Sequence, residues 1–462
     1  MARQQEERVP LLSDEELPED DLGGIQVSIS RARDGRRAPH GTSFPSTSAE
    51  LTSGGSGLSG GEEREEGQTV GRRRKHYSGN EMIVSVFVVQ FNIRKGNEVE
   101  WRHPEEVNLE GIEFKCIASG SHNIPKDFIY FKQGQLFGLS CFEKIKVQSE
   151  EERGVRMKSV GLLAVGYQDL HLHQQFLERQ ARGHVETPGH YGSLEEYFTH
   201  YRSPRHSSNS VPRPLLNGDQ ENSLNQSSTS EVVHPVGAIP KYLEYFGPHI
   251  FVLWKLALLK KRILIFSPPP IGVVCYRVYC TCLLTDHSLG GDLDLDCNPM
   301  FYVNVNDIDS LRSTRHYVAC TSEQILQSKT ELYDVFVDQQ RLVTHLASLD
   351  HLLRITPADK ERYDLLNSIR SNDLITSGGR GNVRNDDFGF VAFFRELNSQ
   401  LLRTMLDAQE REDHLLTVEM VESVGLDPTR DRQFLTELAS LLSLNLNVQR
   451  PTDMMDIFSC CC

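Results

Sequence analysis

Residues 253–270 read LWKLALLKKRILIFSPPP, and this stretch decides the fold. Apolar residues recur at helical spacing over 240–261, which predicts an amphipathic helix with a break near Gly247 and Pro248. The segment RILIF at 262–266 is too short and too β-branched to continue the helix, so it predicts a buried strand. The three prolines that follow extend neither a helix nor a strand ladder, so they end the strand. The predicted helical face carries Ile250, Leu253, Trp254 and Leu258.

The same alternation continues downstream. Residues 271–284 (IGVVCYRVYCTCLL) predict a second helix, and residues 300–309 (MFYVNVNDID) predict a second strand. Helices that alternate with short buried strands are typical of an α/β fold with parallel strands. After residue 351 the spacing becomes mostly helical, as in DDFGFVAFFRELNSQLLRTML at 386–406.

A strand-rich region precedes this alternation. Residues 82–91 (MIVSVFVVQF) predict a strand that is buried on both faces, and two further strands flank a turn at Gly134. A fourth strand is predicted at 156–166 (RMKSVGLLAVG), and a helix at 167–182. Together these elements predict an upstream α/β unit.

Composition sets the boundaries between the units. Residues 1–78 are rich in Gly, Ser, Glu and Arg and predict a disordered tail, and the Ser/Asn/Pro-rich residues 202–235 predict a linker or long loop. The upstream unit then spans 79–201, a central α/β unit 236–350, a helical portion 351–452, and a Cys-ending tail 453–462.

The bulk properties exclude several classes of function. A formal net charge of -15 argues against a nucleic-acid surface, because phosphate binding requires clustered Lys and Arg. The ten cysteines are scattered and no signal peptide opens the chain, so we expect reduced thiols and a cytoplasmic protein. The longest apolar run, 271–284, is shorter than the roughly 20 residues of a membrane span.

Apparent catalytic and metal motifs are weak. SGGRGN at 377–382 lacks the Lys-Ser/Thr ending of a phosphate-binding loop, and the DFG at 387–389 lacks the other kinase motifs. Four cysteines lie within 275–297, but their spacing differs from paired CxxC motifs and predicts core thiols rather than metal ligands. We therefore expect no bound metal.

Three short signals lie near the chain ends. ERVPLL at 7–12 has the form of an acidic dileucine signal, with Glu7, Leu11 and Leu12 as the residues that a sorting adaptor reads, although chance occurrence is the simpler explanation. The basic run GRRRKH at 71–76 is either a solvated linker or a contact with an anionic membrane. The terminal cysteines, Cys460, Cys461 and Cys462, do not form a prenylation box, which leaves S-acylation or a free tail.

Several segments together resemble the DENN-domain family, and within it the Avl9/LCHN branch. They are YFGPHIFVLWKLALLKKRILIFSPPPIGVVCY at 245–276, FYVNVNDID at 301–309, FFRELNSQLL at 393–402 and VGLDPTRDRQFLTEL at 424–438. The resemblance covers roughly residues 80–455. It implies a longin-like α/β unit at 79–201, a central DENN unit at 236–350 and a helical downstream DENN portion at 351–452.

The resemblance implies a guanine nucleotide exchange factor that promotes GDP release from a Rab-type small GTPase in membrane traffic, peripheral on endomembranes. Such a factor stabilises the nucleotide-free GTPase, so it requires neither a cofactor nor a covalent or hydrolytic catalytic group. Asp307 and Asp309 match the Asp-hydrophobic-Asp ending of the family's central strand and are candidate GTPase contacts. Either aspartate is equally well explained as a cap of the turn that follows.

Two other functions remain open. One is a non-catalytic adaptor that binds a GTPase or a longin partner. The other is a GTPase-activating protein that supplies an arginine finger, for which Arg262, Arg312 and Arg315 are candidates.

Overall fold

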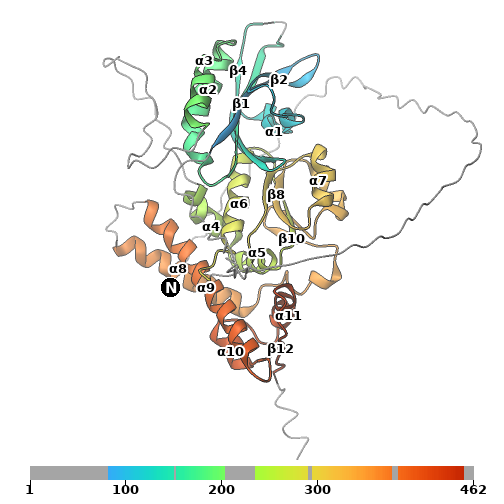
Figure 1. The fold of residues 1–462 in the computed structure, drawn as a ribbon, viewed down its shortest axis with the longest axis vertical. Helices are drawn as coiled ribbons and strands as arrows, with labels where there is room; N and C mark the ends of the chain where they lie inside the picture. The colour runs from blue at the N-terminus through green and yellow to red at the C-terminus, as the bar shows by residue number, and fades with distance from the viewer. Residues whose placement is uncertain (1–81, 150–151, 203–234, 290–293, 377–382, 452–462) are drawn as a thin grey trace, which may run out of the picture. The chain divides into compact units, whose positions relative to one another are not determined.

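The structure is a computed structural model that describes residues 82–149, 152–202, 235–289, 294–376 and 383–451. These residues belong to the second of two units into which the chain divides, residues 71–462. Their main feature is one ten-stranded sheet with the strand order β10-β9-β6-β8-β7-β3-β4-β5-β1-β2 (Figure 1). The mixed α/β class predicted from the sequence is confirmed.

The upstream half of the sheet is antiparallel. Its strands are β1 (Ile83–Asn92), β2 (Gly96–His103), β3 (Lys126–Gln133), β4 (Leu136–Lys146) and β5 (Val155–Ala164). All but β2, which the sequence did not predict, lie close to the predicted positions. The helices α2 (Gln174–Glu186) and α3 (Gly192–Tyr201) pack on one face, and the short helix α1 (Ile112–Cys116) also contacts these strands (Figure 1). A helical cover explains why β1 is buried along most of its length.

The central half of the sheet is parallel. The strands β6 (Arg262–Phe266), β7 (Pro299–Tyr302), β8 (Tyr317–Thr321) and β9 (Val335–Asp338) pair in parallel, and β10 (Arg341–Val343) adds an antiparallel edge. The helices α4 (Ile239–Phe246), α5 (His249–Leu258), α6 (Ile271–Leu283) and α7 (Ile308–Ser313) connect or cover them. RILIF is therefore a central strand between β8 and β9, as its apolar composition predicted.

Two local predictions in this half are wrong. The helix α5 is buried on all sides, including Lys255, rather than amphipathic. The strand predicted over 300–309 ends at Tyr302, because Asn304 begins a capped turn. The cap at Asn304 is local, whereas the carboxylates that bind Lys255 come from distant parts of the chain.

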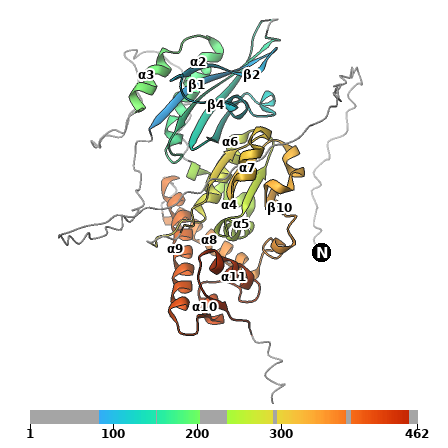
Figure 2. The same cartoon turned by 45° about the vertical axis from the view of Figure 1, so that its right-hand side comes forward.

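The downstream portion is mostly helical. It comprises α8 (Pro357–Thr376), α9 (Val383–Glu410), α10 (Val418–Ser423), α11 (Arg432–Leu441) and a small parallel sheet of β11 (Leu415–Leu416) and β12 (Asn447–Val448). Figure 2 shows α10 and α11 beside the end of α9. The helical character is as predicted, whereas the domain boundaries and the likeness to a longin fold remain predictions.

Candidate functional site

The two halves of the sheet meet at a seam, which we define as the contacts between residues 115–128 and the loops that follow the parallel strands. β3 and β7 join through a single pair, Phe131 and Tyr302. Ser119 donates its backbone N–H to the Tyr302 hydroxyl at 3.3 Å, and its carbonyl accepts a bond from the Ser322 hydroxyl at 2.9 Å. Gly120 has a φ of +87°, and a Cβ there would lie 3.0 Å from Pro269. The carboxyl edge of a parallel sheet, where functional loops usually collect, is thus partly covered by the upstream half.

Asp307 is part of this seam. Its carboxylate accepts the backbone N–H of Asn304 at 3.0 Å, and the Asn304 side chain accepts the N–H of Asn306, so the two residues close a capping box around the turn Val305–Asp307. The other carboxylate oxygen lies 2.8 Å from the ammonium of Lys115, which also donates to the Lys132 carbonyl. Asp307 is buried, so the structure places it in a cap and an ion pair.

Asp309 has a different environment, although it is only two residues away. Its side chain is 96% exposed and pairs with Arg312 at 3.2 Å. Val305 and Ile325 are also exposed, and Val305 donates its N–H to Glu323, which joins their two turns. We call Val305, Asp309 and Ile325 the seam rim. It presents two apolar side chains and one carboxylate to solvent.

The three candidate arginines also differ. Arg262 is half-buried, with its guanidinium 2.8 Å from Asp334 and bonded to the Glu331 carbonyl. Arg312 is exposed and lies between Asp309 and Glu331. Arg315 is exposed. An arginine finger must reach into another protein's nucleotide site, so Arg262 is poorly placed for that role.

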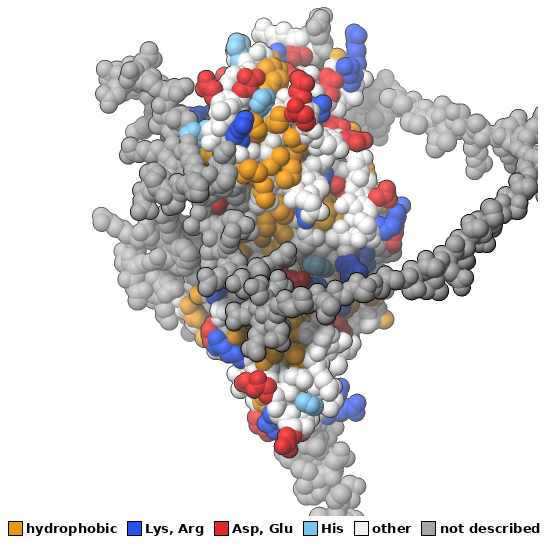
Figure 3. Space-filling view, in the orientation of Figure 1, with side chains coloured by type: hydrophobic (Ala, Val, Ile, Leu, Met, Phe, Trp, Pro, Cys, Tyr) orange, Lys and Arg blue, Asp and Glu red, His pale blue; other side chains and the backbone are white. Residues whose placement is uncertain are grey.

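A shallow hollow lies where β3 meets the start of α6. Its volume is about 280 Å³, and its lining is Lys126, Asp127, Phe128, Gly272, Val273 and Tyr276. Asp127 accepts the first backbone N–H groups of α6, from Ile271 at 2.5 Å and Gly272 at 3.0 Å, and burial raises its pKa to about 6. The carboxylate thereby fastens the upstream half to α6. Apolar side chains reach the surface in a band over the upstream strands, toward the place of α6 in Figure 1 (Figure 3).

The sequence matches a known protein family and several of its members. The family described as DENN domain-containing protein 11 matches residues 86–348, which is more than half of the chain. The chain belongs to this DENN family. It is 44% identical over 369 residues to DENN domain-containing protein 11 of Xenopus laevis, covering 79% of this chain and 85% of the relative. The Mus musculus protein of that name is 44% identical over 373 residues, covering 79% and 82%. The resemblance to the DENN family and its LCHN branch is confirmed.

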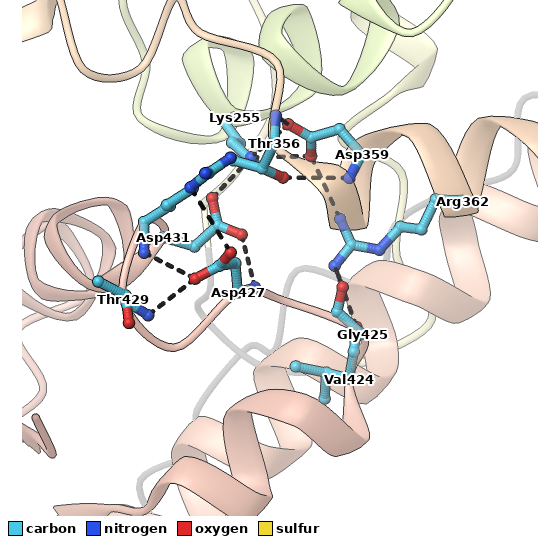
Figure 4. Close-up of polar contacts among 10 residues, drawn as sticks. Lys255, Thr356, Asp359, Arg362, Val424, Gly425, Asp427, Thr429 and Asp431 are labelled. Atoms are coloured by element: carbon cyan, nitrogen blue, oxygen red, sulfur yellow. Dashed lines mark hydrogen bonds and ion pairs between the residues drawn. The ribbon is translucent and has the colours of Figure 1, made fainter. Parts of the chain in front are cut away.

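The DENN-family match ends at residue 348, and a buried charge cluster fastens the helices beyond it to α5 (Figure 4). The Lys255 ammonium lies 2.8 Å from Asp359 at the start of α8 and 2.7 Å from Asp431 before α11. Arg362 approaches Asp359 at 3.6 Å and donates to the Gly425 carbonyl, and burial lowers its pKa. Two cations and two carboxylates balance there, so the cluster is a structural joint.

The structure also bears on the metal, cysteine, membrane and terminal sites considered from the sequence. No group of three or more His, Cys, Asp or Glu side chains in the described residues is arranged to hold a metal. Cys275 and Cys280 are buried free thiols in α6, and the Cys275 sulfur lies 3.8 Å from that of Cys320. Among the helices of the described residues, none combines the length and the apolar composition of a membrane span. The dileucine residues 7–12, the basic run 71–76, the SGGRGN sequence at 377–382 and the cysteines 460–462 lie outside the described residues.

Sequence reasoning missed the upstream side of the seam. Ser119 and its bonded partners Tyr302 and Ser322 are 183 and 203 residues apart, and Lys115 lies on a helix of five residues. A helix this short gives no periodic signal. The one local signal was Gly120 in the ASGS segment, since glycine favours the left-handed backbone conformation that this turn requires.

Proposed function

We propose that this DENN-family chain is a guanine nucleotide exchange factor that accelerates GDP release from a Rab-type small GTPase, on the cytoplasmic face of endomembranes. An exchange factor binds the switch regions and stabilises the nucleotide-free state, so GTP then loads by mass action. It requires a rigid, complementary surface and no covalent catalyst. The family membership and the seam support this function.

The observation that carries the proposal is the seam rim. Val305 and Ile325 provide exposed apolar area, and Asp309 provides an exposed carboxylate, paired with Arg312 on the surface, that a basic group of a partner can reach. Desolvated apolar anchors supply most of the binding energy in protein interfaces, and nearby charges direct the approach of the partner. Because the Val305 turn is closed by a buried capping box, the rim is ordered before a partner binds.

Asp307 acts indirectly in this proposal. Its bonds to Asn304 and Lys115 fix the turn that carries Val305 and Asp309. It is therefore a positioning residue, and its loss lowers both stability and exchange. Asp309 makes the proposed contact, because it is the one of the two candidate aspartates whose carboxylate is exposed.

A panel of purified Rab proteins, each loaded with fluorescent GDP, tests the proposed reaction with the full chain. An exchange factor accelerates GDP release from at least one member without accelerating GTP cleavage. Faster cleavage with unchanged release would instead indicate an activating protein, for which the exposed Arg312 and Arg315 remain candidates. Binding of the GTP form with neither effect would indicate an adaptor.

Variants of the rim test its role on the responding Rab. We expect Asp309→Ala combined with Ile325→Ser to slow GDP release at least tenfold, which is a barrier change of about 1.4 kcal/mol, with unchanged thermal unfolding. The matched control is Glu196→Ala combined with Leu441→Ser, which changes one exposed acid and one exposed apolar residue on α3 and α11. Equal exchange by the rim variant and the control would remove the rim from the mechanism.

A further inference from the structure

A second exposed surface lies at the tip of the hairpin formed by β1 and β2. The residues between the two strands read IRK at 93–95, and β2 is the free edge of the ten-stranded sheet. Three large apolar side chains are exposed there: Phe91 at 40%, Ile93 at 36% and Phe114 of α1 at 43%. Large apolar residues that gather on an exposed tip mark a site of interaction.

The register of the strands places these three side chains together. Asn97 pairs directly with Phe91, so the two side chains point to the same face of the sheet, and Ile93 follows two residues later. On that face the Asn97 amide donates to the carbonyls of Glu113 and Ile117, which bracket Phe114 on α1. The Asn97 bonds therefore hold the helix that carries Phe114 beside the face of the hairpin on which Phe91 lies.

The tip is held in one conformation. The Asn92 side chain accepts the backbone N–H groups of Arg94 at 2.9 Å and Lys95 at 3.3 Å, and Gly96 completes the turn with a φ of +81°. Both cationic side chains are exposed beside Ile93. Lys95 pairs with Glu98 at 3.3 Å but remains 72% exposed, and Glu98 is bonded to Gln90 on the opposite face of the sheet.

We propose that this hairpin tip docks the protein on an anionic lipid bilayer. Phe91, Ile93 and Phe114 enter the interface between headgroups and acyl chains, and Arg94 and Lys95 contact the lipid phosphates and carboxylates. A narrow tip with apolar side chains and adjacent cations suits a bilayer, because acyl chains close around it without a matching pocket. The proposal is independent of exchange activity, which concerns the seam rim.

Vesicle sedimentation with the full chain tests the proposal. We expect binding to vesicles in which about one third of the lipid is phosphatidylserine, weak binding to pure phosphatidylcholine vesicles, and weaker binding at higher salt. Each cation near an anionic surface contributes roughly fivefold to partitioning, so Arg94→Ala combined with Lys95→Ala should reduce binding about 25-fold. Phe91→Ser combined with Phe114→Ser should reduce it at least tenfold.

The controls are Arg430→Ala and Leu441→Ser, which remove an exposed cation and an exposed apolar residue near α11. They should bind vesicles as the wild type does. The charge variant, Arg94→Ala/Lys95→Ala, changes only exposed side chains. It therefore tests the proposal even if the apolar variant, Phe91→Ser/Phe114→Ser, lowers the melting temperature. Wild-type binding by the charge variant would overturn the proposal. Equal binding to neutral and anionic vesicles would also overturn it. So would a dimer of the wild type that the apolar variant no longer forms, because the hairpin tip would then bind a second copy of the chain.

Discussion

The substitution Lys255→Met tests the buried joint between α5 and the downstream helices. The methionine keeps much of the side-chain volume but removes the ammonium that lies 2.8 Å from Asp359 and 2.7 Å from Asp431. Asp431 then retains the N–H of Asp427, and Asp359 retains the N–H of Thr356 and a guanidinium at 3.6 Å. Two buried carboxylates are left with one cation.

Removing one partner from a buried ion pair costs about 3–5 kcal/mol, because an uncompensated charge stays buried. That is a large share of a typical unfolding free energy of about 5–15 kcal/mol. Urea titration monitored by circular dichroism measures the loss. The matched control is Lys261→Met, whose ammonium lies 3.2 Å from Glu437 on a partly exposed surface and should contribute at most about 1 kcal/mol.

Adding Asp431→Asn to Lys255→Met removes one of the orphaned charges. The double variant should therefore be more stable than Lys255→Met alone, which is the sign of direct coupling in a double-mutant cycle. A loss below about 1 kcal/mol for Lys255→Met, or no recovery in the double variant, would refute the reasoning that this cluster joins the helices.

Three further predictions concern the core. Trp254→Ala should cost about 3–5 kcal/mol in urea titration, because the side chain is fully buried, and a stable variant that loses only GTPase binding would contradict its structural role. Burial lowers the pKa of His173 to about 4, below its unfolded value near 6.5, so the unfolded state binds more protons between these values. The free energy of unfolding should fall by up to about 3 kcal/mol as pH drops from 6.5 to 4, and His173→Gln should flatten that dependence. Identical pH profiles for the wild type and the variant would exclude His173 as the group responsible. Gly138→Ala should destabilise by about 1–3 kcal/mol, since a Cβ there would lie 2.2 Å from a carbon of the buried Phe131 ring, and unchanged melting would disprove this clash.

Local patterns predicted the elements, whereas long-range contacts decided the site. The strand at 262–266 and the prolines that end it are consecutive in the sequence, so the apolar run and the prolines were sufficient to predict it. The burial of Lys255 was not predicted, because its acidic partners lie 104 and 176 residues away. Asp307 and Asp309 belong to one motif, yet one is buried against Lys115 and the other is exposed. The spacing Asn304-x-x-Asp307 allows a local cap, but the ion pair that buries Asp307 depends on Lys115 in the upstream half of the chain and could not be predicted from the motif.

The most direct test of the proposed exchange activity is the affinity of the full chain for one responding Rab in three states: nucleotide-free, GDP-bound and GTP-bound. We predict that the nucleotide-free Rab binds at least tenfold more tightly than either nucleotide-bound form, and that added GTP releases it from the complex. Asp309→Ala combined with Ile325→Ser should weaken the nucleotide-free complex. Equal affinity for the three states, or tightest binding of the GTP-bound form, would contradict the exchange mechanism.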